Sequence, residues 1–483
     1  MFKLYQFRQF LIILIIVFIA IPSGSAQISN TFYHMYGIPQ SNQLNPAFQP
    51  DCNGYIGFPM LSPLSINVES NPLRYEDIFS YDSQLDAMIT FLHQNGDKEA
   101  FLSALKENNM ISTSIGSPPI STGWRKEQFY FTVDLSERVD QNFRFTKDFM
   151  EFALNGNKNQ DRFNFSETGL DLNYYHELAV GVSYNYEDEF QIGARAKMLF
   201  GIADLKTRLS DITLKASQDR WELNSSVMLD ITGPFLYIPV DSAGCVVFDS
   251  IGIDPAVKDD YVKALLDNPG KIFGTGNPGL ALDFGFSFSP IENLSLSASV
   301  TDLGFIRWRK DAYQLEQDGT FVWKGIEPKL EEDYDYGEEL LDSVKNQLSF
   351  IRVTEPYSTF LTGKVYLGAA YELNEIVKFG IVNRTRIYNY QFFNQLTLSA
   401  NVRPIQMVSA TLSYSIIGRN YSNFGLGLSL RVGPFNLYFI TDQAPNGYFW
   451  PETISSVNFR FGLNLVFGCA KIPRKLKDRP LID

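Results

Sequence analysis

Residues that could carry catalysis are sparse in this chain of 483 residues, which has only three histidines. His176 stands beside Glu177 in a run of alternating apolar and polar residues, and the chain has no Gly-x-Ser-x-Gly turn to present a nucleophilic serine. The His-Glu-x-x-His metal motif, the P-loop and the glycine-rich dinucleotide motif are also absent from the sequence. We therefore expect a protein that is not an enzyme and that binds no cofactor.

The three cysteines are Cys52, Cys245 and Cys469, and an odd number allows at most one internal disulfide. Their spacing matches no metal-binding motif, so we predict no metal site. Free thiols are the simpler interpretation. A Cys52–Cys469 bridge is the alternative, because both residues fall on the same side of the topology described below, but the sequence does not give their distance.

Other candidate site residues are charges that alternate with apolar residues in strand-like segments. Successive side chains of a strand point to opposite faces, so these charges belong to one polar face together with Ser, Asn, Thr and Gly. Inside a membrane protein such charges stay solvated or paired. The charged residues of this polar face would either line a passage through the protein or form hydrogen bonds with a plug, and both interpretations stay open. The candidates are Arg195, Lys197, Asp283, Lys364, Arg431 and Arg460.

The first 26 residues have the layout of a cleaved secretory signal peptide, 1–26. Lys3 and Arg8 precede an apolar run from Phe10 to Ile21, and Gly24-Ser25-Ala26 supplies small residues for cleavage. Because Lys3 and Arg8 are its only charged residues, removal lowers the formal net charge from −13 to −15. This acidity argues against nucleic acid as a partner, since phosphate binding needs clustered Lys and Arg.

Alternation of apolar and polar residues at strand length repeats along the rest of the chain. In a membrane barrel the outward face of each strand meets lipid and the inward face meets the lumen. One such run fits a soluble sandwich, but fourteen behind a secretion signal predict an all-β membrane protein, a single antiparallel transmembrane β-barrel of about 14 strands. The runs centre near residues 132, 175, 196, 211, 226, 284, 298, 366, 382, 397, 411, 428, 439 and 462.

The lengths of the connections support the barrel, because outer-membrane barrels have short periplasmic turns and longer outer loops. We number the strands backwards from a periplasmic tail at 469–483. Short connections such as 217–220 then fall on the periplasmic side, and one short exception at 203–205 falls outside. This sorting predicts a barrel over residues 128–468 in the outer membrane of a Gram-negative cell. Its long outer loops are 137–162, 233–277 and 304–359.

Residues 27–127 precede the first predicted strand. Pro46, Pro50, Pro59 and Pro63 disfavour a sheet, because proline cannot donate to a ladder, and residues 82–108 show short helical patterns. A barrel of about 14 strands has an interior too wide for its own side chains to fill. We therefore expect this region to plug the lumen with the help of short helices. A small periplasmic cap is the alternative.

Several stretches resemble a known family. Gln43-Leu44-Asn45-Pro46-Ala47-Phe48 is similar to the N-terminal signature of the FadL/TodX-like transporters of hydrophobic compounds, with Asn45, Pro46 and Ala47 as the hatch motif. Residues 176–181, 192–197 and 424–438 resemble strands of an uncharacterised Bacteroidota branch of such barrels. The resemblance implies a fourteen-stranded barrel plugged by an N-terminal hatch, through which hydrophobic ligands pass. Unlike the family pattern, the chain lacks a glycine-rich opening and continues past Phe467 into a basic tail.

Two functions are compatible with these features. The first is a FadL-like channel for uptake of small hydrophobic molecules, which predicts apolar residues converging on a pocket between plug and wall. The second is a non-transporting barrel that serves as a subunit of a larger outer-membrane complex for secretion, assembly or adhesion, which predicts a filled lumen. Outer-membrane lipid is a partner in both. A hydrophobic ligand belongs to the first, and other outer-membrane or periplasmic proteins belong to the second. The resemblance favours the first function slightly.

Overall fold

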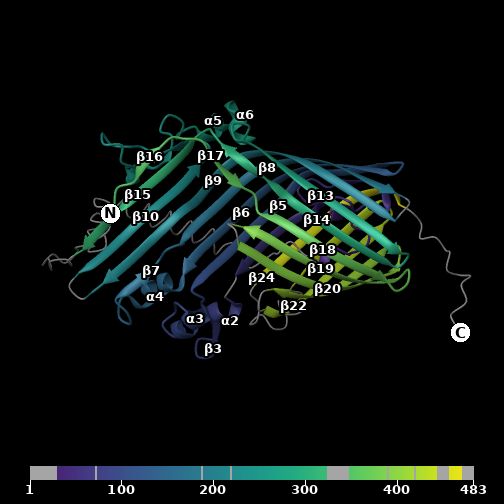
Figure 1. Cartoon of the computed structure of the whole chain (residues 1–483), viewed down its shortest axis with the longest axis horizontal. Helices are drawn as coiled ribbons and strands as arrows, with labels where there is room; N and C mark the ends of the chain where they lie inside the picture. Colours follow the sequence, from purple (N-terminus) through teal and green to yellow (C-terminus); the bar gives the residue numbers. More distant parts are fainter. Residues whose placement is uncertain are drawn as a thin grey trace, which may run out of the picture.

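The computed structural model is built mostly of β-strands (Figure 1). No helix of the described part is long and apolar enough to cross a membrane. The predicted signal peptide, the middle of the predicted loop 304–359 and nearly all of the predicted tail 469–483 lie outside the described residues. The described residues are 30–70, 73–186, 189–217, 220–323, 348–388, 391–417, 420–442 and 456–469.

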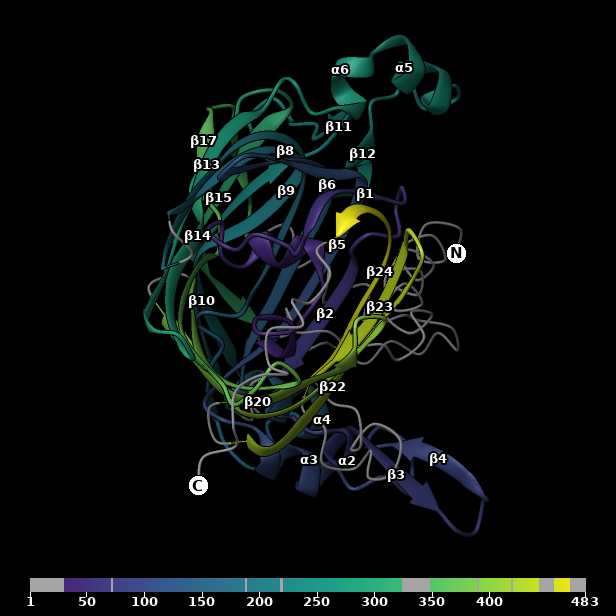
Figure 2. The same cartoon turned by 90° about the vertical axis from the view of Figure 1, so that its right-hand side faces the viewer.

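A closed β-barrel forms the body of the protein (Figures 1 and 2). Among the described residues its wall has 14 strand positions, each antiparallel to its neighbours. One position, the seam strand, consists of β1 (Cys52–Gly57) and β2 (Leu64–Ser70), which join the last strand to β5. The other positions are β5 (Asn108–Lys126), β6 (Phe129–Thr146), β8 (Gly169–Tyr186), β9 (Phe190–Ala216), β13 (Pro278–Ile291), β14 (Leu294–Trp308), β18 (Gly363–Glu372), β19 (Val377–Tyr388), β20 (Gln391–Ile405), β21 (Val408–Ile417), β22 (Asn420–Val432), β23 (Phe435–Thr441) and β24 (Ser456–Cys469).

The outward face of the wall is apolar and the inward face is polar. In β13, Leu280 and Phe284 are 61% and 49% exposed, whereas Asp283 beside them is fully buried. The outward side chains are suited to lipid, and the inward ones share the lumen with other polar groups. This arrangement confirms the barrel that the alternation predicts.

The two ends of the barrel differ. At the turn end, short turns join neighbouring strands, for example Glu127-Gln128 between β5 and β6 and Gly433-Pro434 between β22 and β23. The opposite end, the loop end, carries longer connections, but residues 137–146 of the predicted loop 137–162 belong to β6. The elements of the loop end are α2 (Tyr75–Ile78), β3 (Phe79–Asp82), β4 (Ala87–Thr90), α3 (Lys98–Ala104), α4 (Lys147–Asn155), β7 (Arg162–Asn164), β11 (Leu236–Tyr237), η3 (Phe248–Ser250), β12 (Gly252–Ile253), α5 (Tyr261–Asp267) and α6 (Pro269–Ile272).

On one side the wall continues past the barrel at the loop end (Figure 1). The first part of β9, Phe190–Phe200, pairs with β13, whereas its last part, Asp204–Ala216, pairs with β10 (Trp221–Thr232). The other edge of β10 pairs with β15 (Ala312–Trp323), which is followed by β16 (Ile351–Val353). We call β10, β15, β16 and the last part of β9 the loop-end extension. Beside it, β17 (Tyr357–Phe360) pairs with β14.

The predicted number of strands is right, but two of the predicted strands are wrong. The runs near residues 196 and 211 belong to one strand, β9, and the run near 226 is β10 of the extension. A bulge leaves Ile202 unpaired, so the alternation changes phase there and reads as two runs. No connection exists at 203–205, and the connection 217–220 lies at the loop end instead of the periplasmic end. The seam strand and β5 take the two positions that the prediction lacks.

The predicted boundary between plug and barrel at residue 127/128 is also wrong. Residues 52–70 and 108–126 are part of the wall, and residues 73–107 lie at the loop end. Of the prolines that argued against strands, Pro59 and Pro63 stand between β1 and β2, where the ladder is interrupted, and Pro46 and Pro50 precede β1. Within 82–108, a hairpin and α3 form instead of two helices.

Candidate functional site

The segment 30–51 lies inside the barrel, and we call it the hatch (Figure 2). It contains two short 3-10 helices, η1 (Asn30–Phe32) and η2 (Pro39–Gln43). Its apolar side chains pack closely against the wall, whereas the channel hypothesis predicts that they converge on a pocket. The cluster comprises Phe32, Tyr33, Met35, Ile38 and Leu44 of the hatch and Tyr366, Val382, Tyr438 and Ile440 of the wall.

The Asn45-Pro46-Ala47 turn of the hatch rests on two glycines that face each other across the β9–β13 ladder, Gly193 and Gly285. A Cβ atom at Gly193 would stand 2.1 Å from the carbonyl oxygen of Pro46. One at Gly285 would stand 2.1 Å from Oδ1 of Asn45. The hatch motif therefore docks only because neither position has a side chain. We call these residues the glycine pair.

The Asn45 side chain is fully buried and holds the turn in place. Its Nδ2 donates to the hydroxyl of Tyr33 and to the backbone carbonyl of Phe286, each at 3.2 Å. Its Oδ1 accepts a hydrogen bond from the backbone N–H of Ala47 at 3.0 Å. A buried amide that lost these partners would carry a large desolvation cost, so this residue ties the hatch both to itself and to the wall.

A row of small residues on the opposite wall receives the start of the hatch. Thr31 Oγ1 lies 2.5 Å from Ser413 Oγ, and the Thr31 hydroxyl and backbone N–H both contact the carboxylate of Asp442. Neighbouring strands bring these small side chains to the same height, where the ladder places them opposite one another. The row consists of Gly380, Ser399, Ser413 and Gly425.

His34 lies over Gly380, the first residue of this row. A Cβ atom at Gly380 would stand 2.4 Å from Cδ2 of the His34 ring. The ring Nε2 is 3.2 Å from the carbonyl oxygen of Ile381. Burial, together with the nearby Lys378 ammonium, lowers the pKa of His34 to about 3. A docked hatch therefore holds this imidazole neutral.

A buried ion cluster of four acidic and four basic side chains occupies the lumen beside the hatch. Arg195 Nη2 is 2.6 Å from Asp134 Oδ2, and Lys197 Nζ is 2.9 Å from Asp283 Oδ2. The formal charges balance, which is the condition for charges to persist in a low-dielectric interior. The members are Asp134, Arg138, Glu177, Arg195, Lys197, Asp283, Asp302 and Lys364.

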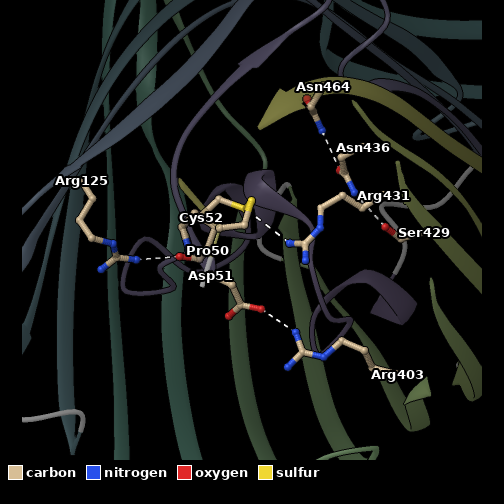
Figure 3. Close-up of a disulfide and its surroundings, with 10 residues drawn as sticks. Pro50, Asp51, Cys52, Arg125, Arg403, Ser429, Arg431, Asn436 and Asn464 are labelled. Carbon is tan, nitrogen blue, oxygen red and sulfur yellow. Dashed lines mark hydrogen bonds and ion pairs between the residues drawn. A yellow bond between two sulfur atoms is a disulfide. The ribbon is translucent and has the colours of Figure 1, made fainter. Parts of the chain in front are cut away.

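The predicted lumen charges fall in three places. Arg195, Lys197, Asp283 and Lys364 belong to the buried ion cluster. Arg460 donates from Nη2 to Gln43 Oε1 of the hatch at 2.7 Å, and its guanidinium stands 4.3 Å from the centre of the Phe32 ring. Arg431 lies apart from the cluster at the turn end, with Nη1 3.8 Å from Cys52 Sγ (Figure 3).

Other residues of this site are missing from the sequence prediction. Asp134, Arg138 and Glu177 alternate in phase with the inward faces of their strands, so the same parity argument could have found them. Asp302 lies at a bulge of β14, where the alternation changes phase, so parity does not find it. The glycine pair gives no such signal, because the reason for glycine lies in the hatch, far away in the sequence.

A disulfide joins Cys52 of β1 to Cys469 of β24 and fixes the end of the hatch at the turn end (Figure 3). This pairing decides between the two alternatives for the cysteines, and Cys245 is free. Asp51 forms a 2.6 Å ion pair with Arg403 of β20. Arg125 Nη2 also donates to the carbonyl of Pro50 at 2.7 Å, and Gln49 Nε2 donates to the backbone carbonyl of Gln128 at 3.1 Å, so several links attach the end of the hatch to the wall.

The seam strand is interrupted beside the hatch. Residues 58–63 separate β1 from β2, and the adjacent strand β5 has a bulge at Pro118-Pro119, where two ladder donors are lost. We call these two segments the seam break. Outward, Met60 and Leu61 are 45% and 41% exposed. Inward, Gln40 Nε2 of the hatch donates to Ser62 Oγ at 3.1 Å.

Some backbone hydrogen bonds still cross the seam break. The Phe58 N–H donates to the Leu463 carbonyl and the Met60 N–H to the Pro118 carbonyl, each at 2.9 Å. Gln40 Nε2 also reaches Asn464 Oδ1 of β24 at 2.6 Å, so the hatch closes the break from the lumen side.

Cavities near the hatch are small and polar. One of about 30 Å³ lies between Gln43 of the hatch and the buried ion cluster, and another of about 40 Å³ nearer the loop end is lined by Asp171, Asp204 and Lys206. Each has room for only a few water molecules. A groove of about 630 Å³ lies instead on the lipid-facing side of β19–β22. Among the described side chains, no group of three or more His, Cys, Asp and Glu could hold a metal ion.

Fold and site together define the class of protein, a closed antiparallel β-barrel of 14 strand positions whose lumen holds the hatch. Residues 46–442 match the model of a family described as "Family of unknown function (DUF5723)", and the chain belongs to this family. No curated protein sequence matches the chain.

Solved structures with a similar fold include bacterial channels. The toluene transporter TbuX of Ralstonia pickettii is 8% identical with a TM-score of 0.41, covering 90% of this chain and 95% of that chain. The toluene transporter TodX of P. putida is 10% identical with a TM-score of 0.37, covering 92% and 96%. A Pseudomonas aeruginosa FadL homologue is 10% identical with a TM-score of 0.34, covering 93% and 100%. The predicted resemblance to FadL/TodX-like barrels is confirmed at the level of fold. The matches do not show a Bacteroidota source.

Proposed function

We propose that the protein is an outer-membrane channel for uptake of small hydrophobic molecules and that it is not an enzyme. In this proposal the loop end faces the exterior and the turn end faces the periplasm, because short turns belong on the periplasmic side. The observation that carries the proposal is the seam break, an interruption of the wall that is apolar on its lipid side and touches the hatch on its lumen side.

The chemistry of the lumen favours a sideways exit through this break. A hydrophobic molecule that moved straight to the turn end would have to displace the end of the hatch, which the Cys52–Cys469 disulfide and the Asp51–Arg403 ion pair attach to the wall. A molecule that moved along the apolar cluster of the hatch would reach Met60, Leu61 and then lipid. The hatch must shift for this to happen, because Gln40 spans the break between Ser62 and Asn464.

The test is uptake of radiolabelled toluene by Gram-negative cells that lack their own hydrophobic channels and express the full chain. Toluene is the probe because TbuX and TodX are described as toluene transporters. We expect uptake above that of cells with an empty vector. The double variant Pro118→Val/Pro119→Thr restores two ladder donors at the break and should return uptake to the vector level.

The matched control is Pro404→Thr, a proline of β20 outside the seam. It should leave uptake unchanged, and all variants should keep the heat-modifiable gel mobility of a folded barrel. Wild-type uptake equal to the vector level would reject the channel, and normal uptake by the Pro118/Pro119 variant would reject the sideways exit.

A second candidate is a non-transporting subunit of a larger outer-membrane complex. Two observations favour it, the closely packed hatch and the loop-end extension, which offers sheet surface beyond the barrel. The exposed Tyr81, Met88 and Leu92 near the β3–β4 hairpin add apolar surface at the same end. This function predicts a stoichiometric protein partner after purification in mild detergent, together with toluene uptake at the vector level.

A further inference from the structure

The lipid-facing groove on β19–β22 has a small floor and large walls. Ala400 of β20 lies directly between Phe379 of β19 and Leu412 of β21, which are its ladder partners on either side. The missing bulk at Ala400 leaves a depression of about 630 Å³ between larger side chains. The other large side chains that line it are Leu398, Tyr414, Phe424 and Leu426.

The groove runs from the turn-end half of the wall towards its middle. Ala400 lies five residues from the end of β20 at Ile405, and Leu412 lies four residues from the start of β21 at Val408. Both strand ends are at the turn end, and a barrel strand crosses the hydrocarbon core in about 9–11 residues. Phe424, eight residues from the end of β22 at Val432, continues the groove towards the loop end.

These positions fit one particular occupant. An acyl chain whose headgroup lies at the turn-end surface passes through this depth on its way to the middle of the bilayer. Inside the groove it contacts protein on three sides, which gains dispersion contacts that a flat wall does not offer. The lining adds the faces of Phe379, Tyr414 and Phe424, and their large apolar surfaces favour a methylene chain.

We propose that this groove is a binding site for one acyl chain of a phospholipid in the leaflet at the turn end. The choice of a phospholipid rests on the orientation given in the proposed function, because the turn end then faces the periplasm. The groove also lies on the outer side of the strands that contact the hatch on their inner side. Gly380, Ser399, Ser413 and Gly425, on the inner face of these strands, receive Thr31 and His34, so one layer of sheet separates the lipid from the hatch.

The experiment is native mass spectrometry of the full chain, extracted from outer membranes in mild detergent, with fragmentation to identify each retained lipid. Ala400→Phe fills the floor of the groove from the lipid side. Ala196→Phe is the matched control, because Ala196 of β9 is an exposed residue between Val180 and Leu282, outside the groove.

We expect wild type and Ala196→Phe to retain one phospholipid per barrel. Ala400→Phe should retain it at least about tenfold less, because the new ring displaces several methylene groups from protein contact. Equal retention by all three proteins, no lipid on wild type, or lipid A in place of phospholipid would each overturn the proposal. The measurement involves no transport, so its result is independent of whether toluene is taken up.

Discussion

Gly193 and Gly285 lie directly opposite each other on β9 and β13, and the Asn45-Pro46-Ala47 turn fills the space where their Cβ atoms would stand. This relationship explains why a short motif of the hatch depends on residues far away in the chain. Because the wall has no side chains at these two positions, the turn approaches the backbone of the wall closely. The start of the hatch contacts another group of small residues, on the opposite wall.

Adding one methyl group to the glycine pair should therefore dislodge the hatch. Gly193→Ala places a Cβ atom 2.1 Å from a backbone oxygen, which cannot rotate away. Overpacking of this kind costs about 1–3 kcal/mol. We expect higher ion conductance in planar bilayers, since the docked hatch fills the lumen. Gly252→Ala is the control, because its new Cβ meets nothing within 4 Å. Equal conductance of the two variants would show that the close approach has no effect on docking.

Breaking the buried ion cluster should destabilise the whole barrel. Arg195→Met removes the partner of Asp134 and one partner of Asp283, all nearly inaccessible to solvent. Leaving buried charges without a partner costs about 3–5 kcal/mol. We expect the heat-modifiable gel transition to move to a lower temperature. Arg74→Met breaks the exposed Arg74–Glu76 pair and should change the transition little. A transition of Arg195→Met at the wild-type temperature would contradict this assignment.

Removal of the disulfide should loosen the end of the hatch. Cys52 and Cys469 are 417 residues apart in the sequence, so their bond restricts the unfolded chain strongly. We expect Cys52→Ser to lower the free energy of unfolding by about 2–5 kcal/mol and to increase protease cleavage near residue 51. Cys245→Ser changes a free cysteine and should behave as wild type in both assays. If both variants unfold alike, the bond contributes nothing to stability.

Acid should weaken docking of the hatch through His34. The undocked imidazole gains a proton near its ordinary pKa of 6.5, whereas the docked one resists protonation down to a pKa of about 3. Docking is therefore fully stable above pH 6.5 and weakens as the pH falls through this window, by up to about tenfold per unit. Conductance should rise between about pH 7 and pH 4 in wild type. In His34→Gln the conductance should rise less over this pH range. An equally large rise would show that carboxylate groups, and not His34, cause the pH dependence.

The barrel itself is predictable because alternation is local. Leu280, Asp283 and Phe284 reveal their faces without knowledge of the rest of the chain. The bulge at Ile202 is not predictable in this way, since it is defined by the partner strand, and it divided β9 into two apparent strands.

For the candidate site, the sequence predicts only which residues lie on the inward face of the wall. The inward parity of Arg195 and Lys197 is readable from the sequence, but their partners on other strands depend on register. Likewise, Gly193 and Gly285 appear only as small inward residues until the hatch is placed on them. The Cys52–Cys469 bond depends on the distance between two chain ends, which spacing does not give.

A reversible lock on the hatch tests the central claim most directly, namely that the hatch must move for hydrophobic molecules to pass. Thr31 Oγ1 and Ser413 Oγ are 2.5 Å apart, so Thr31→Cys/Ser413→Cys should form a disulfide between hatch and wall. Toluene uptake should fall to the vector level in the oxidised double variant and recover with reductant. The single variants and wild type, treated identically, control for the Cys52–Cys469 bond. Unchanged uptake with the lock closed would contradict a moving hatch.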